Sequence, residues 1–192
     1  MVFIILRKTK EATMKYTVET ILDRFDSNDN LNFLFFWGHT ENKDYVTKAC
    51  LSQWYESEFK ENEITYFTTE HYMMAEKAKL FDDINIYNQI LETRKQGKIK
   101  ELGRQIKNFN QSIWDQHKYE IVLKGNFLKF SQNKKLKIFL LNTKNKILVE
   151  ASPLDTIWGI GLSADDEKVN NPHLWEGTNL LGFALMEVRD KF

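Results

Sequence analysis

The sequence predicts an α+β domain that is mainly helical, with only a few short strands. Apolar residues recur at helical spacing in several long segments, whereas the continuous apolar runs are short. No repeat, low-complexity tract or proline-rich linker divides the chain of 192 residues, which contains two prolines. A chain of this length can bury one sizeable core, so we expect a single domain over residues 14–192. Residues 1–13 are treated as a candidate non-native or disordered N-terminal extension, because Met14 begins a more ordinary soluble stretch.

The first half of the chain predicts one helix, short strands and then a buried helix. Residues 18–25 place apolar side chains at helical spacing, and the turn formers 26–30 stop that helix. Short strands are expected over residues 34–37 and within residues 59–67, where apolar and polar residues nearly alternate. Thr68, Thr69 and Glu70 supply the hydroxyl and early acid of a helix start. The helix that follows, to Phe81, has two apolar faces and is expected to be deeply buried.

The second half predicts four further helices, one short buried strand and a last helix at the carboxyl end. The first two are expected over residues 83–94 and 98–109, and Gly103 lies inside the second. Ser112 can cap the next, which extends to about Phe127, and Leu136 and Leu140 mark another. The strand is expected at residues 147–149 and the last helix at 180–188.

Composition excludes several classes of protein. The 27 basic and 27 acidic residues cancel, so no global field draws the chain to nucleic acid or to an anionic membrane. Cys50 is the single cysteine, which excludes an intrachain disulfide. The apolar start, residues 1–6, is too short for a membrane span and lacks the features of a signal peptide. We therefore expect a cytoplasmic protein that does not bind membranes.

Common catalytic centres are missing from the sequence, but three carboxylates stand in aromatic surroundings. The four histidines have no short metal-ligand spacing, and no Walker loop, dinucleotide fingerprint or nucleophile elbow is present, so neither a metal nor a cofactor is expected. Glu70 precedes His71 and Tyr72, Glu150 follows an apolar strand, and Asp155 lies three residues before Trp158. Hydrolysis of a ribosyl C–N bond needs such groups, because a carboxylate can stabilise the cationic sugar or activate water while indoles stack on the base.

Each of these residues also has a purely structural interpretation. Glu70 could favour the dipole of its helix, and Asp155 could cap the turn that follows it. Trp114 and Trp158 are large apolar residues of the kind that usually belong to a core. The residues alone therefore indicate a globular protein that could be a metal-free hydrolase.

The segment TTEHYMMAEKA, residues 68–78, closely resembles the helix signature of the YbiA/NADAR (NAD and ADP-ribose associated) family of N-glycosidases. Further blocks that resemble the family follow in the right order: residues 102–104, 108–109, Trp114, 129–130, 148–152, Asp155, 158–162 and 175–182. Residues 36–38 and 50–55 are similar to the amino-terminal part of one branch. The resemblance covers residues 35–189, whereas the stretch 37–53 is longer than in the shortest family members.

This resemblance implies a YbiA-like fold with a central ligand pocket, and it implies roles for particular residues. Glu70 becomes the first choice for the catalytic carboxylate, with Asp155 as its partner. The remaining residues implied to bind substrate are Trp114 and Trp158 around the base or ribose, Lys77 and Arg104 at phosphate or ribose, and Phe36, Gly159 and Asn179.

Three hypotheses about function stay open. The first is an N-glycosidase of a phosphorylated ribosyl metabolite similar to riboflavin-pathway intermediates, and the second is a hydrolase that removes ADP-ribose from guanine bases in DNA or nucleosides. Residues 121–149 favour the second, since they carry seven lysines and no acid while residues 150–176 carry six acids and one lysine. The third is a non-catalytic module that binds NAD or ADP-ribose, against which the retained Glu70 and Asp155 weigh.

Overall fold

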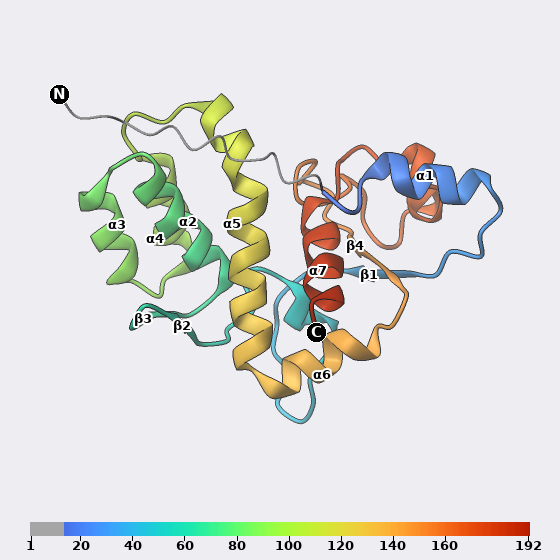
Figure 1. The fold of residues 1–192 in the computed structure, drawn as a ribbon, viewed down its shortest axis with the longest axis horizontal. Helices are drawn as coiled ribbons and strands as arrows, with labels where there is room; N and C mark the ends of the chain where they lie inside the picture. The colour runs from blue at the N-terminus through green and yellow to red at the C-terminus, as the bar shows by residue number, and fades with distance from the viewer. Residues whose placement is uncertain (1–13) are drawn as a thin grey trace.

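The helices form two groups on either side of one long central helix, α5 (Gln111–Gln132), in a computed structural model that describes residues 14–192 (Figure 1). The expected extension over residues 1–13 lies outside the described residues. One group consists of α2 (Thr69–Leu80), α3 (Ile84–Leu91) and α4 (Gln96–Arg104). On the other side of α5, helix α7 (Leu180–Asp190) packs against the strand pair of the fold. The chain is thus a mainly helical α+β domain, as its sequence predicts.

The strand pair joins β1 (Phe33–Phe36) to β4 (Ile147–Glu150) in parallel. Phe33 lies opposite Ile147 and Phe36 lies opposite Glu150. A parallel pair requires a long crossover connection, and here that connection contains α2, α3, α4 and α5. The first three residues of β4 are buried, and Glu150 is half-buried as a residue with a buried carboxyl oxygen, so this strand ends in an acidic side chain at the edge of the core.

A second pair of strands forms a hairpin, β2 (Phe59–Glu61) and β3 (Ile64–Tyr66), as expected within residues 59–67. Asn62 and Glu63 form its two-residue loop with φ values of 47° and 66°, the left-handed conformation that matches the twist of a hairpin. Gln132 holds the hairpin on α5, because its amide donates to the Lys60 carbonyl and accepts from the Lys60 N–H.

Local capping decides where the helices begin and end. Thr68 caps α2, as predicted, and Thr17, for which no prediction was made from the sequence, caps α1 (Val18–Asp26). Helix α4 ends at Arg104, well before the expected Phe109, with Gln105 as its C-cap, and the chain then turns through Asn108, which has a left-handed φ of 55°.

The cap of α5 corrects the prediction that Ser112 starts this helix. Asn110 is the capping residue instead, since its side-chain oxygen accepts the N–H of Ile113. Helix α3 is also shorter than expected and ends at Leu91. The remaining helix, α6 (Lys134–Asn142), follows α5 after one residue, and three short 3₁₀ helices that were not expected from the sequence complete the fold: η1 (Lys48–Leu51), η2 (Glu167–Asn170) and η3 (Pro172–Leu174).

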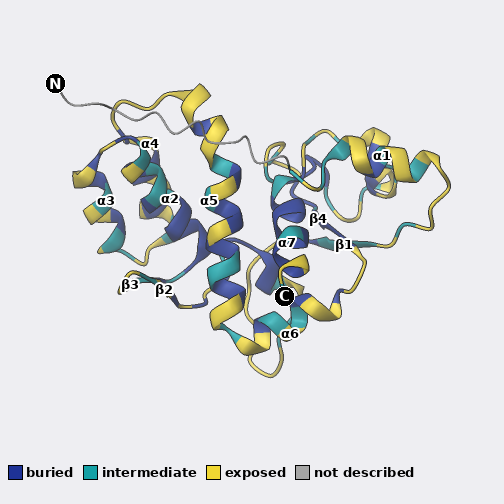
Figure 2. Cartoon of the chain, viewed as in Figure 1, coloured by how far each residue is buried: buried dark blue, intermediate teal, exposed yellow. Residues whose placement is uncertain are grey.

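The core runs through the inner faces of α2, α5 and α7 and through β4 (Figure 2). Helix α2 is buried on nearly all sides, which explains why its sequence has two apolar faces rather than one. The described chain, residues 14–192, contains no helix that is both long enough and apolar enough to cross a membrane.

Candidate functional site

Glu70 lies in the first turn of α2 and is almost completely buried, with 6% of its surface exposed. Its backbone N–H donates to the carbonyl of Gln53 at 3.0 Å. The Gln53 side chain also reaches the Glu70 carboxyl group, with 3.4 Å between Nε2 and Oε2. Burial raises the pKa of Glu70 to about 7, Lys100 and Lys77 act to lower it, and Asp155 acts to raise it further. A carboxyl group with such a pKa can both accept and release a proton near neutral pH.

Lys77 lies seven residues after Glu70 and therefore two turns further along the same face of α2. Its ammonium group donates to the Gly103 carbonyl at 3.2 Å, and it lies 4.4 Å from the Phe109 ring centre and 5.5 Å from that of Trp114. Burial lowers the pKa of Lys77, and the charge of Glu70 opposes this effect. Trp114 is packed in the core with 9% of its surface exposed, so it forms part of the wall around the Lys77 ammonium group.

Lys100 and Trp54 join the site from α4 and from the turn after η1. The Lys100 ammonium group lies 5.1 Å from the Trp54 ring centre, and the Trp54 carbonyl accepts from the Gln96 side chain. Lys100 is exposed, and its positive charge acts on Glu70. The predicted phosphate contact Arg104 is exposed on the same helix four residues later, on the same face as Lys100.

Glu150 is the second buried carboxyl group, and it belongs to the end of β4. Its backbone N–H donates to Asn179 at 2.9 Å and its carbonyl accepts from Ile160 at 3.0 Å. Its Oε2 atom is buried and has no hydrogen-bond partner among residues 14–192. Burial raises the pKa of Glu150 to about 8, and the charges of Asp155 and Glu70 act in the same direction.

Asp155 lies in the loop that folds back over the end of β4. One of its carboxyl oxygens accepts the N–H groups of Ile157 at 2.9 Å and Trp158 at 2.8 Å, so Asp155 does cap the turn that follows it. Its charge also acts on both glutamates. Asp155 therefore has both a structural and an electrostatic role, and its bond to the backbone of the half-buried Trp158 holds the two residues together.

Gly159 allows the loop to approach the strand this closely. A Cβ atom at this position would lie 2.8 Å from the Glu150 carbonyl oxygen and 2.9 Å from the Asp155 carbonyl oxygen. The role that the structure gives Gly159 is thus to shape the site, whereas the resemblance implied contact with substrate.

Two other residues that the resemblance implied to bind substrate have side chains that are buried and make contacts within the protein. Asn179 is fully buried, donates to the Leu148 carbonyl and accepts from Glu150, so its amide supports β4. Phe36 has 1% of its surface exposed and packs in the core, while its carbonyl accepts from Ala151. Both act on the site by holding the end of β4, and neither presents a free side chain to a ligand.

The sequence model of the NADAR domain family matches residues 35–192 of the chain. The chain belongs to the NADAR family. An N-glycosidase of Acanthamoeba polyphaga mimivirus is 49% identical over 165 residues, which cover 83% of this chain and 95% of that protein. A chloroplastic riboflavin biosynthesis protein of Zea mays is 31% identical over 134 residues, which cover 66% of this chain and 20% of that protein.

A solved structure shares the fold of this NADAR protein. The solution NMR structure of Escherichia coli YbiA superimposes with a TM-score of 0.64 at 24% identity, and the match covers 83% of this chain and 84% of that chain. This likeness establishes a YbiA-like fold, as the sequence resemblance implied.

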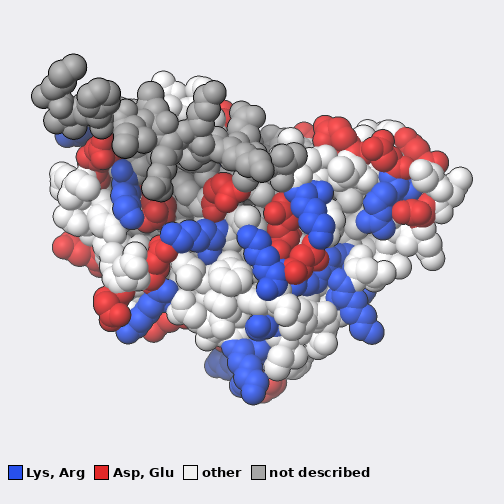
Figure 3. Space-filling view, viewed as in Figure 1, with Lys and Arg blue, Asp and Glu red and all other residues white. Residues whose placement is uncertain are grey.

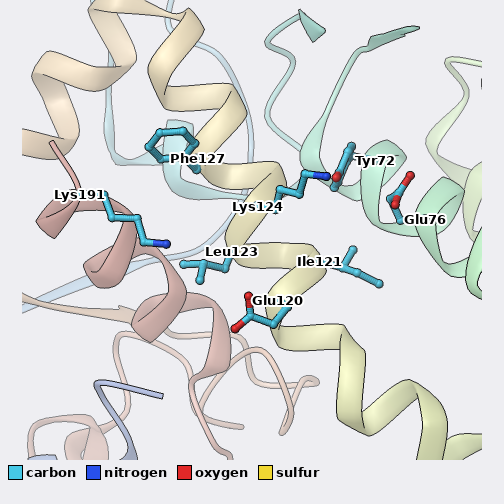
Figure 4. A pocket seen from close by; sticks show the side chains of 8 residues that line it. All are labelled: Tyr72, Glu76, Glu120, Ile121, Leu123, Lys124, Phe127 and Lys191. Atoms are coloured by element: carbon cyan, nitrogen blue, oxygen red, sulfur yellow. The ribbon is translucent and has the colours of Figure 1, made fainter. Parts of the chain in front are cut away.

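The NADAR domain also has a cavity of about 440 Å³, lined by both apolar and charged side chains, that is separate from the candidate site (Figure 4). Tyr72 and Glu76 of α2 line it together with residues of α5 and with Lys191. Because a helix has about 3.6 residues per turn, Tyr72 and Glu76 lie on the side of α2 opposite Glu70. No candidate site residue lines this cavity.

Sequence reasoning missed Gln53, Trp54 and Lys100 as site residues. Gln53 and Trp54 belong to the block 50–55 that resembles the family, so that block was the available signal. Nothing in the local sequence distinguishes Lys100 from the other lysines. Within residues 14–192, no group of three histidine, cysteine, aspartate or glutamate side chains is placed to hold a metal ion.

Proposed function

We propose that this NADAR protein is an N-glycosidase that hydrolyses the C–N bond of a phosphorylated ribosyl metabolite similar to riboflavin-pathway intermediates. Hydrolysis of an N-glycosyl bond is supported by the viral N-glycosidase, which matches over 95% of its length. One observation carries the proposal. Glu70 and Asp155 belong to distant segments of the chain, yet they lie close enough in the fold for the charge of Asp155 to raise the pKa of Glu70.

The chemistry follows from where charge develops during the reaction. As the C–N bond breaks, positive charge builds on the ribose, and a carboxylate beside it stabilises that charge or accepts a proton from the attacking water. Glu70 is suited to this task because its pKa of about 7 leaves a large ionised fraction at neutral pH. Trp158 is half-buried and its backbone N–H is held by Asp155, so its indole is our choice to stack on the departing base.

Cations on α2 and α4 support a phosphorylated substrate. Lys77 and Lys100 both act on Glu70 from these two helices, and Arg104 shares the exposed face of Lys100. A phosphate group held here would place the ribose near Glu70. The Zea mays relative, named for riboflavin biosynthesis, supports an aminopyrimidine ribosyl phosphate as the first substrate to test.

The decisive experiment incubates purified protein with three substrates and identifies the products by mass spectrometry. The substrates are the aminopyrimidine ribosyl phosphate of riboflavin synthesis, ADP-ribosylated guanosine and ADP-ribosylated DNA. We expect release of ribose 5-phosphate from the first, at a rate that a metal chelator does not change. Glu92→Gln, a substitution at the exposed C-cap of α3, serves as the control protein. Preference for either guanine substrate would replace the proposal of a metabolite substrate. Failure to cleave any of the three substrates would contradict the proposal that the protein is an N-glycosidase acting on them.

Exposed lysines of α6 favour ADP-ribosylated DNA as the second candidate substrate. The lysine-rich stretch 121–149 forms a smaller surface than its sequence suggests, because Lys129 is fully buried and Lys124 pairs with Glu61. Lys134 and Lys135 remain exposed at the start of α6. Elsewhere, basic and acidic side chains are interspersed on the face shown in Figure 3, which favours a small substrate.

If DNA is the substrate, the double substitution of Lys134 and Lys135 by glutamate is expected to weaken DNA binding and flatten its salt dependence. Each phosphate contact that is lost lowers the slope of log K against log salt by about 0.9 for duplex DNA or about 0.7 for a single strand. Cleavage of ADP-ribosylated guanosine should be unchanged. Lys168→Glu, at an exposed lysine of η2, is the matched control. If cleavage of ADP-ribosylated DNA and of ADP-ribosylated guanosine fell equally, Lys134 and Lys135 would be needed for the folded structure rather than for DNA binding.

A non-catalytic module for NAD or ADP-ribose is the third candidate. The site brings Glu70, Glu150 and Asp155 together, and carboxylates repel the phosphates of such ligands. A binder has no use for that arrangement, so the structure supports an enzyme over a binding module.

A further inference from the structure

Within the described chain, the side chain of Glu150 makes no hydrogen bond through its Oε2 atom that would explain its presence structurally. The strand needs only its backbone, whose N–H is held by Asn179 and whose carbonyl is held by Ile160. The Oε2 atom is nevertheless buried without a hydrogen-bond partner within residues 14–192. A buried polar atom without a partner destabilises the fold, so its presence calls for an explanation in function.

The surroundings of Glu150 and Glu70 differ in charge. Lys100 and Lys77 act on Glu70, and both favour its ionised form. The charges that act on Glu150 are those of Asp155 and Glu70, and both oppose ionisation. Two interacting carboxyl groups in such surroundings divide into one that is charged and one that holds a proton. The surroundings of Glu150 therefore favour its protonated form more than those of Glu70 do.

We infer that Glu150 is a catalytic residue, the general acid that donates a proton to the departing nitrogen, while Glu70 is the base for the attacking water. This inference rests on the proposed function. It adds a residue that the sequence placed among the candidate carboxylates but did not select for catalysis. Glu150 lies at the end of β4, where the loop that carries Asp155 and Gly159 packs against its backbone.

The step balances without any further reactant. The C–N bond breaks with its electron pair on nitrogen, and that nitrogen takes the proton from Glu150. Water forms the new bond to the ribose carbon and gives one proton to Glu70. Glu150 ends as a carboxylate and Glu70 as an acid, and exchange of one proton with solvent at each group restores the starting state.

The inference predicts a particular response to Glu150→Gln, which keeps the shape of the side chain and removes its acidic proton. With the aminopyrimidine ribosyl phosphate as substrate, kcat should fall about a hundredfold or more and KM should change by less than about threefold. The wild-type profile of kcat/KM against pH should be bell-shaped, rising as Glu70 ionises near pH 7 and falling as Glu150 ionises near pH 8. The variant should lose the alkaline limb.

Melting temperatures supply a readout that does not depend on turnover. The folded-state pKa of Glu150 is raised, so the stability contributed by its neutral form is lost as pH rises toward about 8. Glutamine cannot ionise, so Glu150→Gln should melt increasingly above the wild type between pH 5 and pH 8.5. The matched control, Glu92→Gln, should show wild-type rates and a constant difference in melting temperature.

The outcomes separate the inference from the proposed function. Wild-type turnover by Glu150→Gln, or inactivity accompanied by a melting temperature well below that of the wild type at pH 8, would overturn the role of Glu150 as the acid. A wild-type protein that cleaves none of the three substrates would count against the proposed function. In that case the melting series still decides whether Glu150 holds a proton, and a constant difference across the pH range would overturn that premise.

Discussion

Replacing Glu70 by glutamine is expected to lower the turnover number about a hundredfold or more, with little change in substrate affinity. Glutamine keeps the size of the side chain and its contact with Gln53, but it carries no charge to stabilise a ribosyl cation and cannot accept a proton from water. The loss should therefore appear in the chemical step. Single-turnover rates and substrate binding, measured on the same preparation, distinguish this effect from lost affinity.

The stability of Glu70→Gln separates catalysis from a role in the helix. If Glu70 only favours the dipole of α2, its loss lowers stability by about 1 kcal/mol or less, and activity survives. Burial raises its pKa to about 7, so the stability of the neutral form is lost as pH rises through 7. The variant should accordingly melt at or above the wild-type temperature at pH 8. Glu76→Gln, on the opposite side of the same helix, is the matched control. Full turnover by Glu70→Gln would refute the catalytic role and make Asp155 the next residue to test.

Features fixed by local chemistry were predictable from the sequence. The start of α2 follows from Thr68, whose hydroxyl accepts the N–H of His71, and the start of α1 follows from Thr17 in the same way. The cap of α5 was assigned to the wrong residue, because Asn110 and Ser112 are both good capping residues two positions apart. Spacing alone does not choose between them, and in the structure Asn110 is the cap because its side-chain oxygen accepts the N–H of Ile113.

Features fixed by long-range pairing were not predictable. The sequence shows that Glu150 follows an apolar strand, but nothing local indicates that this strand pairs with β1 or that the charge of Glu70 acts on Glu150. The same limit applies to the lysines. Lys129 looks like one member of a basic surface, yet it is fully buried and donates to the Ser52 carbonyl at 2.9 Å. Its environment depends on how α5 packs against the turn after η1.

The family resemblance supplied what local chemistry could not. It selected Glu70 and Asp155 from the three carboxylates in aromatic surroundings, and the structure brings these two within electrostatic range. It also assigned Asn179 to the substrate, whereas the structure uses that side chain to hold β4. A residue common to a family motif can thus shape a site without touching its ligand.

Gly159→Ala is expected to reduce activity about a hundredfold while the protein remains folded. The added methyl group would lie 2.8 Å from the Glu150 carbonyl oxygen and 2.9 Å from that of Asp155, with the Ser152 Cβ atom at 3.1 Å. Two of these neighbours are backbone atoms and cannot rotate away, so the loop must move off the end of β4. A displacement of about 1 Å of groups that must be aligned for reaction costs about a hundredfold in rate.

The expected cost in stability is smaller than the cost in rate. Overpacking of this kind destabilises by about 1–3 kcal/mol, and in a chain of this size each kcal/mol lowers the melting temperature by about 2–4 °C. Gly97→Ala is the matched control, because Gly97 lies in α4 with no atom within 4 Å of the added Cβ. It should keep wild-type activity. If Gly159→Ala also keeps full activity, the close approach of the loop to Glu150 is not needed for catalysis, and the site must tolerate movement of Asp155.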